Sequence, residues 1–408
     1  MDKILNYITR TSFNKEIKIS GSKSESNRLL ILQQFYSNLI IENLGNANDV
    51  AILQDALKHL KSEKNIGHAG TAMRFLTAYF STISKETILT GSKRMQKRPM
   101  KILVDALRIL GVKITYLNKD GFPPIKIKGT NIIKDTIKMD GFVSSQYISA
   151  LLLIAPSLKN GLTIELIGKV TSKPYIKMTL SLLEEIGIKT TWLANKIKVF
   201  PKIEIKDKTI IVESDWSSVS YFYSLVALSK KSKLKISYFK KESLQGDKAL
   251  VEIYKQFGVK TTFVEDSIII EKQEGFKQKK HVTFNLIETP DIAQTIAVTC
   301  FGLRVSCDLT GLHTLKIKET DRLEALKIEL KKLGAKVRIT EDSFHLKNEK
   351  PKTKDNKIFC IETYKDHRMA MAFAPLSLLM PLTIKDAEVI NKSYPDFWCD
   401  FEKILNPK

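Results

Sequence analysis

The sequence has few residues of the kinds that form disulfides or bind metals. Its 408 residues contain six histidines and four cysteines, at positions 300, 307, 360 and 399, with no Cys-x-x-Cys spacing. Neither a disulfide framework nor a metal site is therefore predicted, and no cofactor is expected. The simplest interpretation of the cysteines is a set of reduced, buried thiols in a cytoplasmic protein.

Long apolar segments are also missing. No run of about 18 apolar residues occurs, so we expect no membrane-spanning helix. Residues 1–6 lack the apolar centre of a signal peptide. The composition, 43% hydrophobic and 27% charged, is typical of a soluble protein, and the length favours two domains.

Acidic residues are outnumbered by basic ones. There are 66 lysines and arginines against 44 aspartates and glutamates, which gives a formal net charge of +22. Such a charge attracts anions, and nucleic acid is one candidate. The lysines are scattered, however, and form neither a long basic run nor an RNA-binding aromatic motif. Small phosphorylated substrates suit this charge equally well.

An internal repeat organises the chain. Glycines at 111, 187, 258 and 334 each follow a helical pattern and precede a strand, a polar turn and a second strand. Each glycine stands where a helix C-terminus favours a left-handed residue. The spacing predicts repeats of about 75 residues that combine helices with β-hairpins.

A second series of helices has the same period. Their expected beginnings are near Ser24, Gly70, Ser144, Ser217, Asp291 and Asp366. The first interval is short because no hairpin pattern follows residues 57–61, so six repeats are predicted, one of them abbreviated. The sixth lacks chain for its hairpin, and we expect residues 1–20 to supply its two strands. The predicted domains are residues 21–213, and residues 1–20 together with 214–408, with three repeats each.

The first turns of these helices carry cations. Lysine or arginine beside the positive end of a helix is unfavourable unless an anion binds there. Residues 21–28 (Gly-Ser-Lys-Ser-Glu-Ser-Asn-Arg) are the first example, with Ser24 as the expected cap and Lys23 and Arg28 about one turn apart. The Gly-x-x-x-x-Gly-Lys-Ser/Thr pattern of nucleotide triphosphatases is absent. Several such helix N-termini at one place would form an anion site.

Further strings of the same polar and basic character follow along the chain. They are residues 69–74 (Ala-Gly-Thr-Ala-Met-Arg), 94–99 (Arg-Met-Gln-Lys-Arg-Pro), 144–146 (Ser-Ser-Gln), 172–175 (Ser-Lys-Pro-Tyr), 318–322 (Lys-Glu-Thr-Asp-Arg), 366–371 (Asp-His-Arg-Met-Ala-Met) and 392–396 (Lys-Ser-Tyr-Pro-Asp). In this order they resemble the signature strings of the 5-enolpyruvylshikimate-3-phosphate (EPSP) synthases. The resemblance implies an α/β fold: a two-domain inside-out α/β prism of six βαβαββ-type repeats that closes over its substrates.

The resemblance also implies an activity and site residues. The expected enzyme moves the enolpyruvyl group of phosphoenolpyruvate to the 5-hydroxyl of shikimate 3-phosphate without a metal. The implied phosphoenolpyruvate-binding residues are Lys23, Gly70, Arg98, Gln146, Arg322, Arg368 and Lys392. The implied shikimate 3-phosphate-binding residues are Lys23, Ser24, Arg28, Ser144, Ser145, Gln146, Ser172, Tyr175, Asp291, Thr314 and Lys318. Asp291 and Glu319 resemble the proton-handling pair, assisted by Lys23, and Glu319 is expected between Lys318 and Arg322.

Three positions depart from the family pattern. His68 replaces an asparagine, and we interpret it as structural. Thr314 replaces an asparagine that contacts the substrate phosphate and keeps a shorter hydroxyl donor. Phe75 replaces a proline, whose loss is expected to loosen the helix start nearby and leaves glyphosate sensitivity open.

Two alternatives remain at this point. The sister transferase that acts on UDP-N-acetylglucosamine shares the fold but uses a cysteine on the loop that corresponds to residues 93–99, where this chain has none. The other is a basic, non-catalytic protein that binds nucleic acid. We expect the enzyme, as a monomer with small-molecule substrates and no nucleic-acid or membrane partner.

Overall fold

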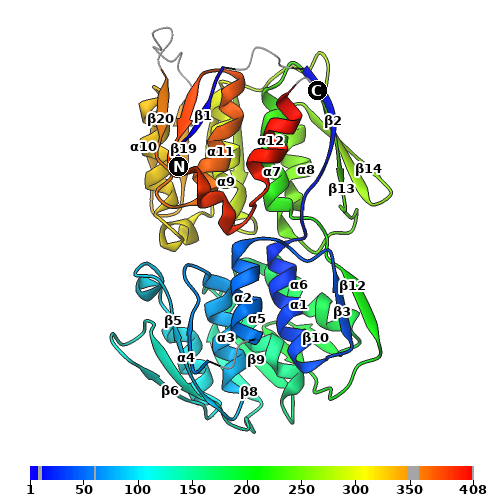
Figure 1. Ribbon diagram of the computed structural model, residues 1–408, viewed down its shortest axis with the longest axis vertical. Helices are drawn as coiled ribbons and strands as arrows, with labels where there is room; N and C mark the ends of the chain where they lie inside the picture. The colour runs from blue at the N-terminus through cyan, green and yellow to red at the C-terminus, as the bar shows by residue number, and fades with distance from the viewer. Residues whose placement is uncertain (8–11, 59–60, 348–357, 407–408) are drawn as a thin grey trace. The chain divides into compact units, whose positions relative to one another are not determined.

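In the computed structural model the chain is described at residues 1–7, 12–58, 61–347 and 358–406. It divides into two compact units (Figure 1). One comprises Gly21–Val212, and the other combines Met1–Ser20 with Glu213–Lys408. We call them the N-terminal unit and the C-terminal unit.

The helices of the N-terminal unit are α1 (Lys23–Phe35), α2 (Asn48–Lys58), α3 (Gly70–Ser81), α4 (Lys101–Ile109), α5 (Ser145–Ile154) and α6 (Lys173–Glu185), with 3-10 turns η1 (Met95–Lys97) and η2 (Ala155–Ser157). Its strands are β3 (Leu39–Glu42), β4 (Glu63–Asn65), β5 (Glu86–Thr90), β6 (Lys113–Tyr116), β7 (Ile125–Lys128), β8 (Thr136–Asp140), β9 (Leu162–Ile167), β10 (Thr190–Leu193), β11 (Lys196–Val199) and β12 (Lys208–Ile211).

These strands form a repeated sheet pattern. In the order β4-β5-β7-β6, the first pair is parallel and the hairpin that follows is antiparallel, and β8-β9-β11-β10 repeats this arrangement. The abbreviated repeat has β3 alone, and β12 from the end of the unit pairs with it in parallel. No hairpin is assigned among the described residues between α2 and β4.

The helices of the C-terminal unit are α7 (Trp216–Leu228), α8 (Leu250–Lys255), α9 (Ala293–Gly302), α10 (Arg322–Lys332), α11 (His367–Phe373) and α12 (Phe397–Leu405), with 3-10 turns η3 (Gly246–Ala249), η4 (Pro290–Ile292), η5 (His313–Ile317), η6 (Ala374–Leu378) and η7 (Ala387–Lys392). Its strands are β1 (Lys3–Leu5), β2 (Ser12–Lys18), β13 (Lys231–Ser237), β14 (Val259–Val264), β15 (Ser267–Lys272), β16 (His281–Asn285), β17 (Ser306–Thr310), β18 (Lys336–Ile339), β19 (Phe344–Lys347), β20 (Phe359–Ile361) and β21 (Leu382–Ile384).

The two N-terminal strands join different sheets of this unit. β1 pairs with β21 in the sheet of the last repeat, whereas β2 pairs in parallel with β13 in the sheet β14-β15-β13-β2. The expectation that both strands complete the sixth repeat is therefore wrong. The polar turn expected between them includes residues 8–11, which lie outside the described residues.

Glycine ends one helix in each of four repeats. Gly111, Gly187, Gly258 and Gly334 follow α4, α6, α8 and α10, and all have positive φ angles, between 74° and 100°. A side chain at such a φ is strained, whereas glycine adopts it freely. The predicted C-terminal glycines are confirmed.

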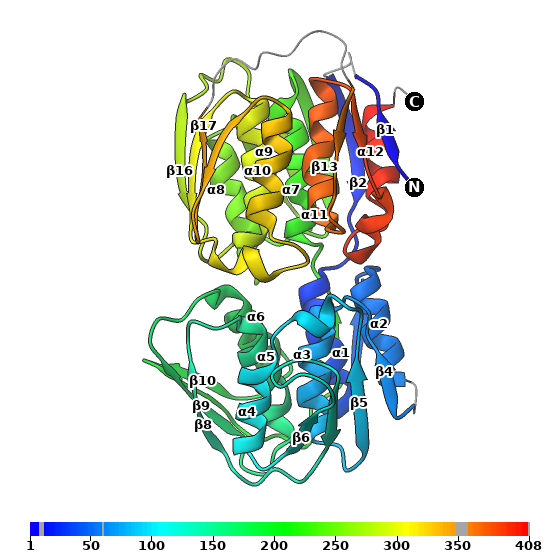
Figure 2. The same ribbon diagram turned by 90° about the vertical axis from the view of Figure 1, so that its left-hand side faces the viewer.

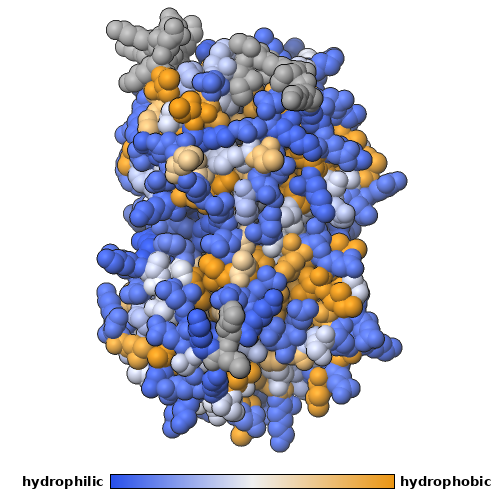
Figure 3. Space-filling view, in the orientation of Figure 1, coloured by the Kyte–Doolittle hydropathy of each residue, from blue (hydrophilic) through white to orange (hydrophobic). Residues whose placement is uncertain are grey.

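Each unit has helices at its centre and sheets outside. Helices α7, α9 and α11 are buried on nearly every side and contact one another, as α1, α3 and α5 do in the N-terminal unit. A helix buried all round occupies a core, whereas the strands alternate buried and exposed residues, as half-buried sheets do. Figure 2 shows β16 and β17 at the edge of their unit with α9 inward from them. Figure 3 shows one face, which is mostly hydrophilic with some groups of hydrophobic residues.

Candidate active site

In the N-terminal unit, α1 begins at the first basic string. Ser22, and not Ser24 as expected, caps this helix, because the Ser22 hydroxyl accepts from the Glu25 amide at 3.5 Å. Lys23 is the first helical residue, and its Nζ lies 3.6 Å from the buried carboxylate of Asp49 on α2. Ser24 lies beside it in the first turn, where its hydroxyl is not committed to capping.

Arg28 is buried and joins three helices. It donates from Nε to Thr179 Oγ1 on α6 at 2.8 Å and from Nη1 to the Ser24 carbonyl on α1 at 2.7 Å. From Nη2 it donates to the Tyr175 carbonyl on α6 at 3.1 Å and to Ser149 Oγ on α5 at 3.2 Å. Burial lowers the pKa of Arg28 to about 10, so the group remains a cation at neutral pH. The ring of Phe75 lies 5.4 Å from this guanidinium, a cation–π distance. α3 is regular from Gly70 onward, so the loosening expected from Phe75 is not observed.

Gly70 and Arg98 lie in direct contact. A Cβ atom added at Gly70 would be 2.3 Å from Arg98 Nη1. The loop that carries Arg98 is held by Arg74, which donates to the carbonyls of Gly70 and Pro99 at 3.1 Å, and by the Tyr147 hydroxyl, which donates to the Pro99 carbonyl at 2.5 Å. The missing side chain at Gly70 therefore allows a guanidinium to lie against the start of α3.

The remaining predicted residues of this unit are at the starts of α5 and α6. Ser144 caps α5, and Gln146 Nε2 donates to Thr71 Oγ1 at 3.3 Å, which joins the first turns of α5 and α3. Ser145 is buried beside them. Ser172 precedes α6 in a left-handed conformation, with φ of 51°, and makes no capping hydrogen bond. Such strain in a non-glycine residue is concentrated at functional sites.

In the C-terminal unit, Arg322 is the centre of a cluster of charged side chains. It donates from Nε to Asp366 at 2.7 Å, from Nη1 to Asp291 at 2.9 Å and from Nη2 to Glu319 at 2.9 Å. Burial opposes its charge, but Asp366, Glu319 and Asp291 together raise the pKa of Arg322 above its usual range. The cluster therefore contains a permanent cation.

Asp291 contacts three cations. Besides Arg322, its carboxylate lies 3.3 Å from Arg368 Nη2 and 3.5 Å from Lys318 Nζ. It lies in the turn η4 just before α9, so these cations surround it in addition to the helix N-terminus that the sequence predicted.

Glu319 and Lys392 form the other side of the cluster. Lys392 Nζ lies 3.6 Å from Glu319 Oε1, while Glu319 Oε2 accepts from Arg322. The expected placement of Glu319 between Lys318 and Arg322 is therefore half right, because Lys318 pairs with Asp291 instead. Thr314, in η5, has a buried hydroxyl that makes no hydrogen bond within the described residues.

The structure reveals contributors that the sequence reasoning did not assign to the site. Asp49 faces Lys23, Arg74 holds the Arg98 loop, and Asp366 accepts from Arg322. Arg74 and Asp366 lie inside two of the quoted strings, so a signal for them existed. Asp49 lies in none of them, and nothing in the sequence pairs it with Lys23. His68 Nδ1 lies 2.9 Å from the Ser92 hydroxyl, which agrees with a structural role.

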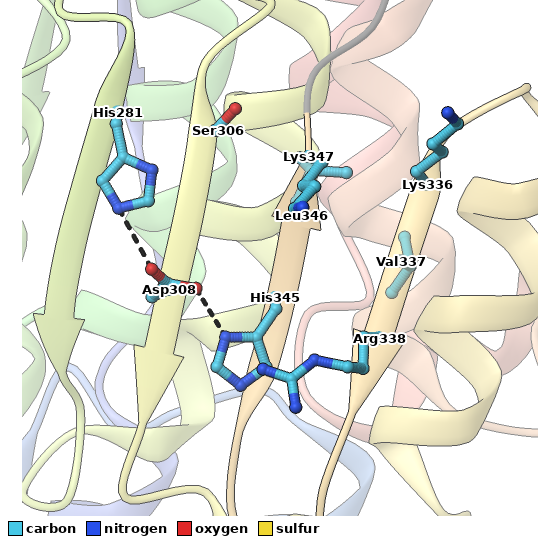
Figure 4. A pocket seen from close by; sticks show the side chains of 9 residues that line it. All are labelled: His281, Ser306, Asp308, Lys336, Val337, Arg338, His345, Leu346 and Lys347. Atoms are coloured by element: carbon cyan, nitrogen blue, oxygen red, sulfur yellow. Dashed lines mark hydrogen bonds and ion pairs between the residues drawn. The ribbon is translucent and has the colours of Figure 1, made fainter.

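A pocket on the solvent face of the sheet β16-β17-β19-β18 contains none of the predicted site residues (Figure 4). In it, His281 Nε2 and His345 Nδ1 lie 3.1 Å and 2.5 Å from the two oxygens of Asp308. The hydrogen bond from His345 lowers the pKa of Asp308. Within the described residues, no group of three His, Cys, Asp or Glu side chains could hold a metal ion, and no helix is both long and apolar enough to cross a membrane.

Residues 61–401 match the family model described as EPSP synthase (3-phosphoshikimate 1-carboxyvinyltransferase). The chain belongs to the EPSP synthase family. A 3-phosphoshikimate 1-carboxyvinyltransferase of Bacteroides fragilis is 42% identical over 390 residues, which cover 95% of this chain and 94% of the relative. One of Histophilus somni is 36% identical over 423 residues, covering 95% and 96%.

A solved structure has a similar fold. An EPSP synthase of Acinetobacter baumannii has a similar structure, with a TM-score of 0.75 at 22% identity, covering 98% of this chain and 97% of the other. The predicted fold class, the family resemblance and the assignment as a transferase of the shikimate pathway are confirmed. The UDP-N-acetylglucosamine transferase and the nucleic-acid-binding protein are not favoured.

Proposed function

We propose that this chain transfers the enolpyruvyl group of phosphoenolpyruvate to the 5-hydroxyl of shikimate 3-phosphate and releases phosphate. The observation that carries the proposal is the cluster around Arg322, in which two acids, Asp291 and Glu319, are held by fixed cations. A reaction that moves two protons among anionic substrates needs such groups at fixed positions.

The proposed chemistry has two steps. The 5-hydroxyl oxygen attacks C2 of phosphoenolpyruvate while C3 gains a proton, which gives a tetrahedral adduct. C3 then loses a proton and the bond between C2 and the phosphate oxygen breaks, so the products are the enolpyruvyl ether and phosphate. We assign Asp291 as the base that accepts the hydroxyl proton. We assign Glu319 as the group that gives a proton to C3 and later takes one back. The ammonium of Lys392, whose Nζ lies 3.6 Å from Glu319 Oε1, supplies the proton that Glu319 gives. Lys23 is kept as the further helper that the family resemblance implies.

The cations have binding roles in this proposal. Arginines bind phosphates and carboxylates through two parallel hydrogen bonds. We assign phosphoenolpyruvate to Lys23, Gly70, Arg98, Gln146, Arg322, Arg368 and Lys392. We assign shikimate 3-phosphate to Lys23, Ser24, Arg28, Ser144, Ser145, Gln146, Ser172, Tyr175, Asp291, Thr314 and Lys318. Support comes from the buried Thr314 hydroxyl, which makes no hydrogen bond within the described residues. It also comes from the helix beginnings at which several of these residues lie, namely those of α1, α3, α5 and α6 in one unit and of α9, α10 and α11 in the other.

We also propose that the enzyme acts as a monomer in the cytoplasm, with these small molecules as its partners. Cys300 and Cys307 are buried as expected, whereas Cys360 and Cys399 are exposed, so the expectation of four buried thiols is half right. All four are free, which suits a reducing compartment. Light scattering coupled to gel filtration tests the monomer: a mass near 46.4 kDa is expected, and twice that mass would refute it.

The deciding assay measures phosphate released from the two substrates together. We expect release only when both are present and an undiminished rate in EDTA, because no step needs a metal. Release with UDP-N-acetylglucosamine in place of shikimate 3-phosphate, or loss of activity in the chelator, would contradict the proposal.

A further inference from the structure

A buried carboxylate without an assigned role adjoins the Arg322 cluster. Asp247, in η3, is 3% exposed, and within the described residues it forms no salt bridge. Its two oxygens accept hydrogen bonds from two hydroxyl groups: Thr289 Oγ1 donates to Oδ1, and Ser217 Oγ donates to Oδ2. A buried charge held only by hydroxyl groups is unfavourable for folding, so a function is the more direct explanation for it.

The first hydroxyl holds the turn that carries Asp291. Thr289 is buried and immediately precedes η4, whose central residue is Asp291. Its amide donates to the Leu286 carbonyl at 3.0 Å, so backbone and side chain are both fixed. Asp247 is thus linked to Asp291 through the Thr289 side chain and one intervening residue, Pro290.

The second hydroxyl holds Arg368. Because the Ser217 proton points to Asp247, the lone pairs of Ser217 Oγ are available to accept from Arg368 Nη2 at 3.3 Å. The same nitrogen lies 3.3 Å from Asp291 Oδ2. Arg368 is thus placed between an oriented hydroxyl and the carboxylate of Asp291.

The charges of these groups are coupled as well. Burial raises the pKa of Asp247, the negative charge of Asp291 raises it further, and the Arg368 guanidinium acts in the opposite direction. A change at Asp247 is therefore felt at both neighbours through charge as well as through hydrogen bonds.

We propose that Asp247 is a positioning residue for the transfer reaction, which orients Asp291 through Thr289 and Arg368 through Ser217. It touches neither substrate and is not a catalytic residue. This inference rests on the roles of Asp291 and Arg368 given above.

The test uses kinetics to separate the effects of the two hydroxyl groups that donate to Asp247. Thr289→Val removes the first hydroxyl and is expected to lower kcat about 10-fold while the KM for phosphoenolpyruvate stays within twofold. Ser217→Ala removes the second and is expected to raise that KM about 10-fold with kcat nearly unchanged. Asp247→Asn keeps the shape of the side chain but offers only one acceptor oxygen. This variant is expected both to lower kcat and to raise the KM for phosphoenolpyruvate.

A double variant tests whether Asp247 acts through Ser217. If it does, Ser217→Ala combined with Asp247→Asn has a KM for phosphoenolpyruvate no higher than Ser217→Ala alone. Thr299→Val is the matched control, since Thr299 is a buried threonine of α9 whose hydroxyl bonds to Tyr254, Ser224 and the Thr295 carbonyl, and not directly to Asp247, Ser217 or Thr289. We expect kcat and KM of this variant to be normal, whatever the change in its melting temperature.

Normal kinetic constants in Asp247→Asn, or additive effects in the double variant, would overturn the inference. A kinetic loss that appears equally in Thr299→Val would do the same, because it would reflect stability alone. Asp291→Ala and Arg368→Ala are measured in parallel. If these two retain normal turnover, the site assignment itself fails; if they lose activity and Asp247→Asn does not, only the positioning role fails.

Discussion

Gly70 and Arg98 fit together only because Gly70 has no side chain. The guanidinium of Arg98 occupies the space that a Cβ atom would need, with Nη1 at 2.3 Å from that position. The contact places a cation against the first turn of α3, whose amides also favour an anion.

Gly70→Ala is therefore expected to displace Arg98 rather than the backbone. The end of an arginine side chain moves easily, so the melting temperature should stay within a few degrees. The KM for phosphoenolpyruvate should rise roughly 10- to 100-fold, which corresponds to a lost charge-assisted hydrogen bond. Steady-state kinetics with each substrate varied in turn measures this. An unchanged KM would contradict the role of this contact.

Asp291→Ala is expected to lower kcat by about 10²- to 10⁴-fold, the usual effect of removing a general base. Binding of phosphoenolpyruvate should largely survive, because Arg322 and Arg368 lose a competing carboxylate. Turnover and affinity are measured together, with Glu319→Gln alongside. Near-normal turnover in Asp291→Ala would leave this residue as a structural partner of Arg322 only.

The carboxyl group of Glu213 is expected to make the free energy of unfolding depend on pH. It is buried, accepting from Trp216 Nε1 at 2.8 Å and from the Lys240 amide at 2.9 Å, and burial raises its pKa. The folded state then holds a proton that the unfolded state has lost. The free energy of unfolding therefore falls as pH rises from about 4.5 through the folded pKa.

Glu213→Gln removes this titration and should flatten that slope. Urea denaturation at several pH values between about 4.5 and 7.5 compares the variant with the unchanged protein. The Asp247 carboxyl, with a pKa raised in the same direction, adds a slope of the same sign to both proteins. Equal slopes in the two proteins would show that Glu213 does not contribute.

Deleting residues 1–18 should destabilise the C-terminal unit. The deletion removes β2, whose Phe13 and Ile17 are buried and whose seven residues pair with β13. Burial of those two side chains alone contributes roughly 3–6 kcal/mol. Deleting residues 1–6 removes only the short strand β1 and should cost less. Melting curves of the three proteins decide this, and equal melting temperatures would contradict the pairing.

Local patterns in the sequence were sufficient for the repeat. Gly111, Gly187, Gly258 and Gly334 mark helix ends because a left-handed backbone favours glycine, whatever lies nearby in space. The helix beginnings near Gly70 and Ser144 were equally readable, since free amide groups and capping side chains act within a single turn. The cations of the candidate site could be named for the same reason, because they belong to those turns and to recognisable strings.

The tertiary structure decided which partners these groups have. β1 and β2 follow one another in the chain but join different sheets, because strand pairing depends on which open sheet edge lies within reach. Lys318 pairs with Asp291 and Lys392 with Glu319, although Lys318 and Glu319 are neighbours in sequence. Asp247 became visible only when Ser217 and Thr289 came together around it. The sequence determined the helices, the repeats and the chemical groups, since these depend on nearby residues, whereas long-range contacts fix how buried charges are paired.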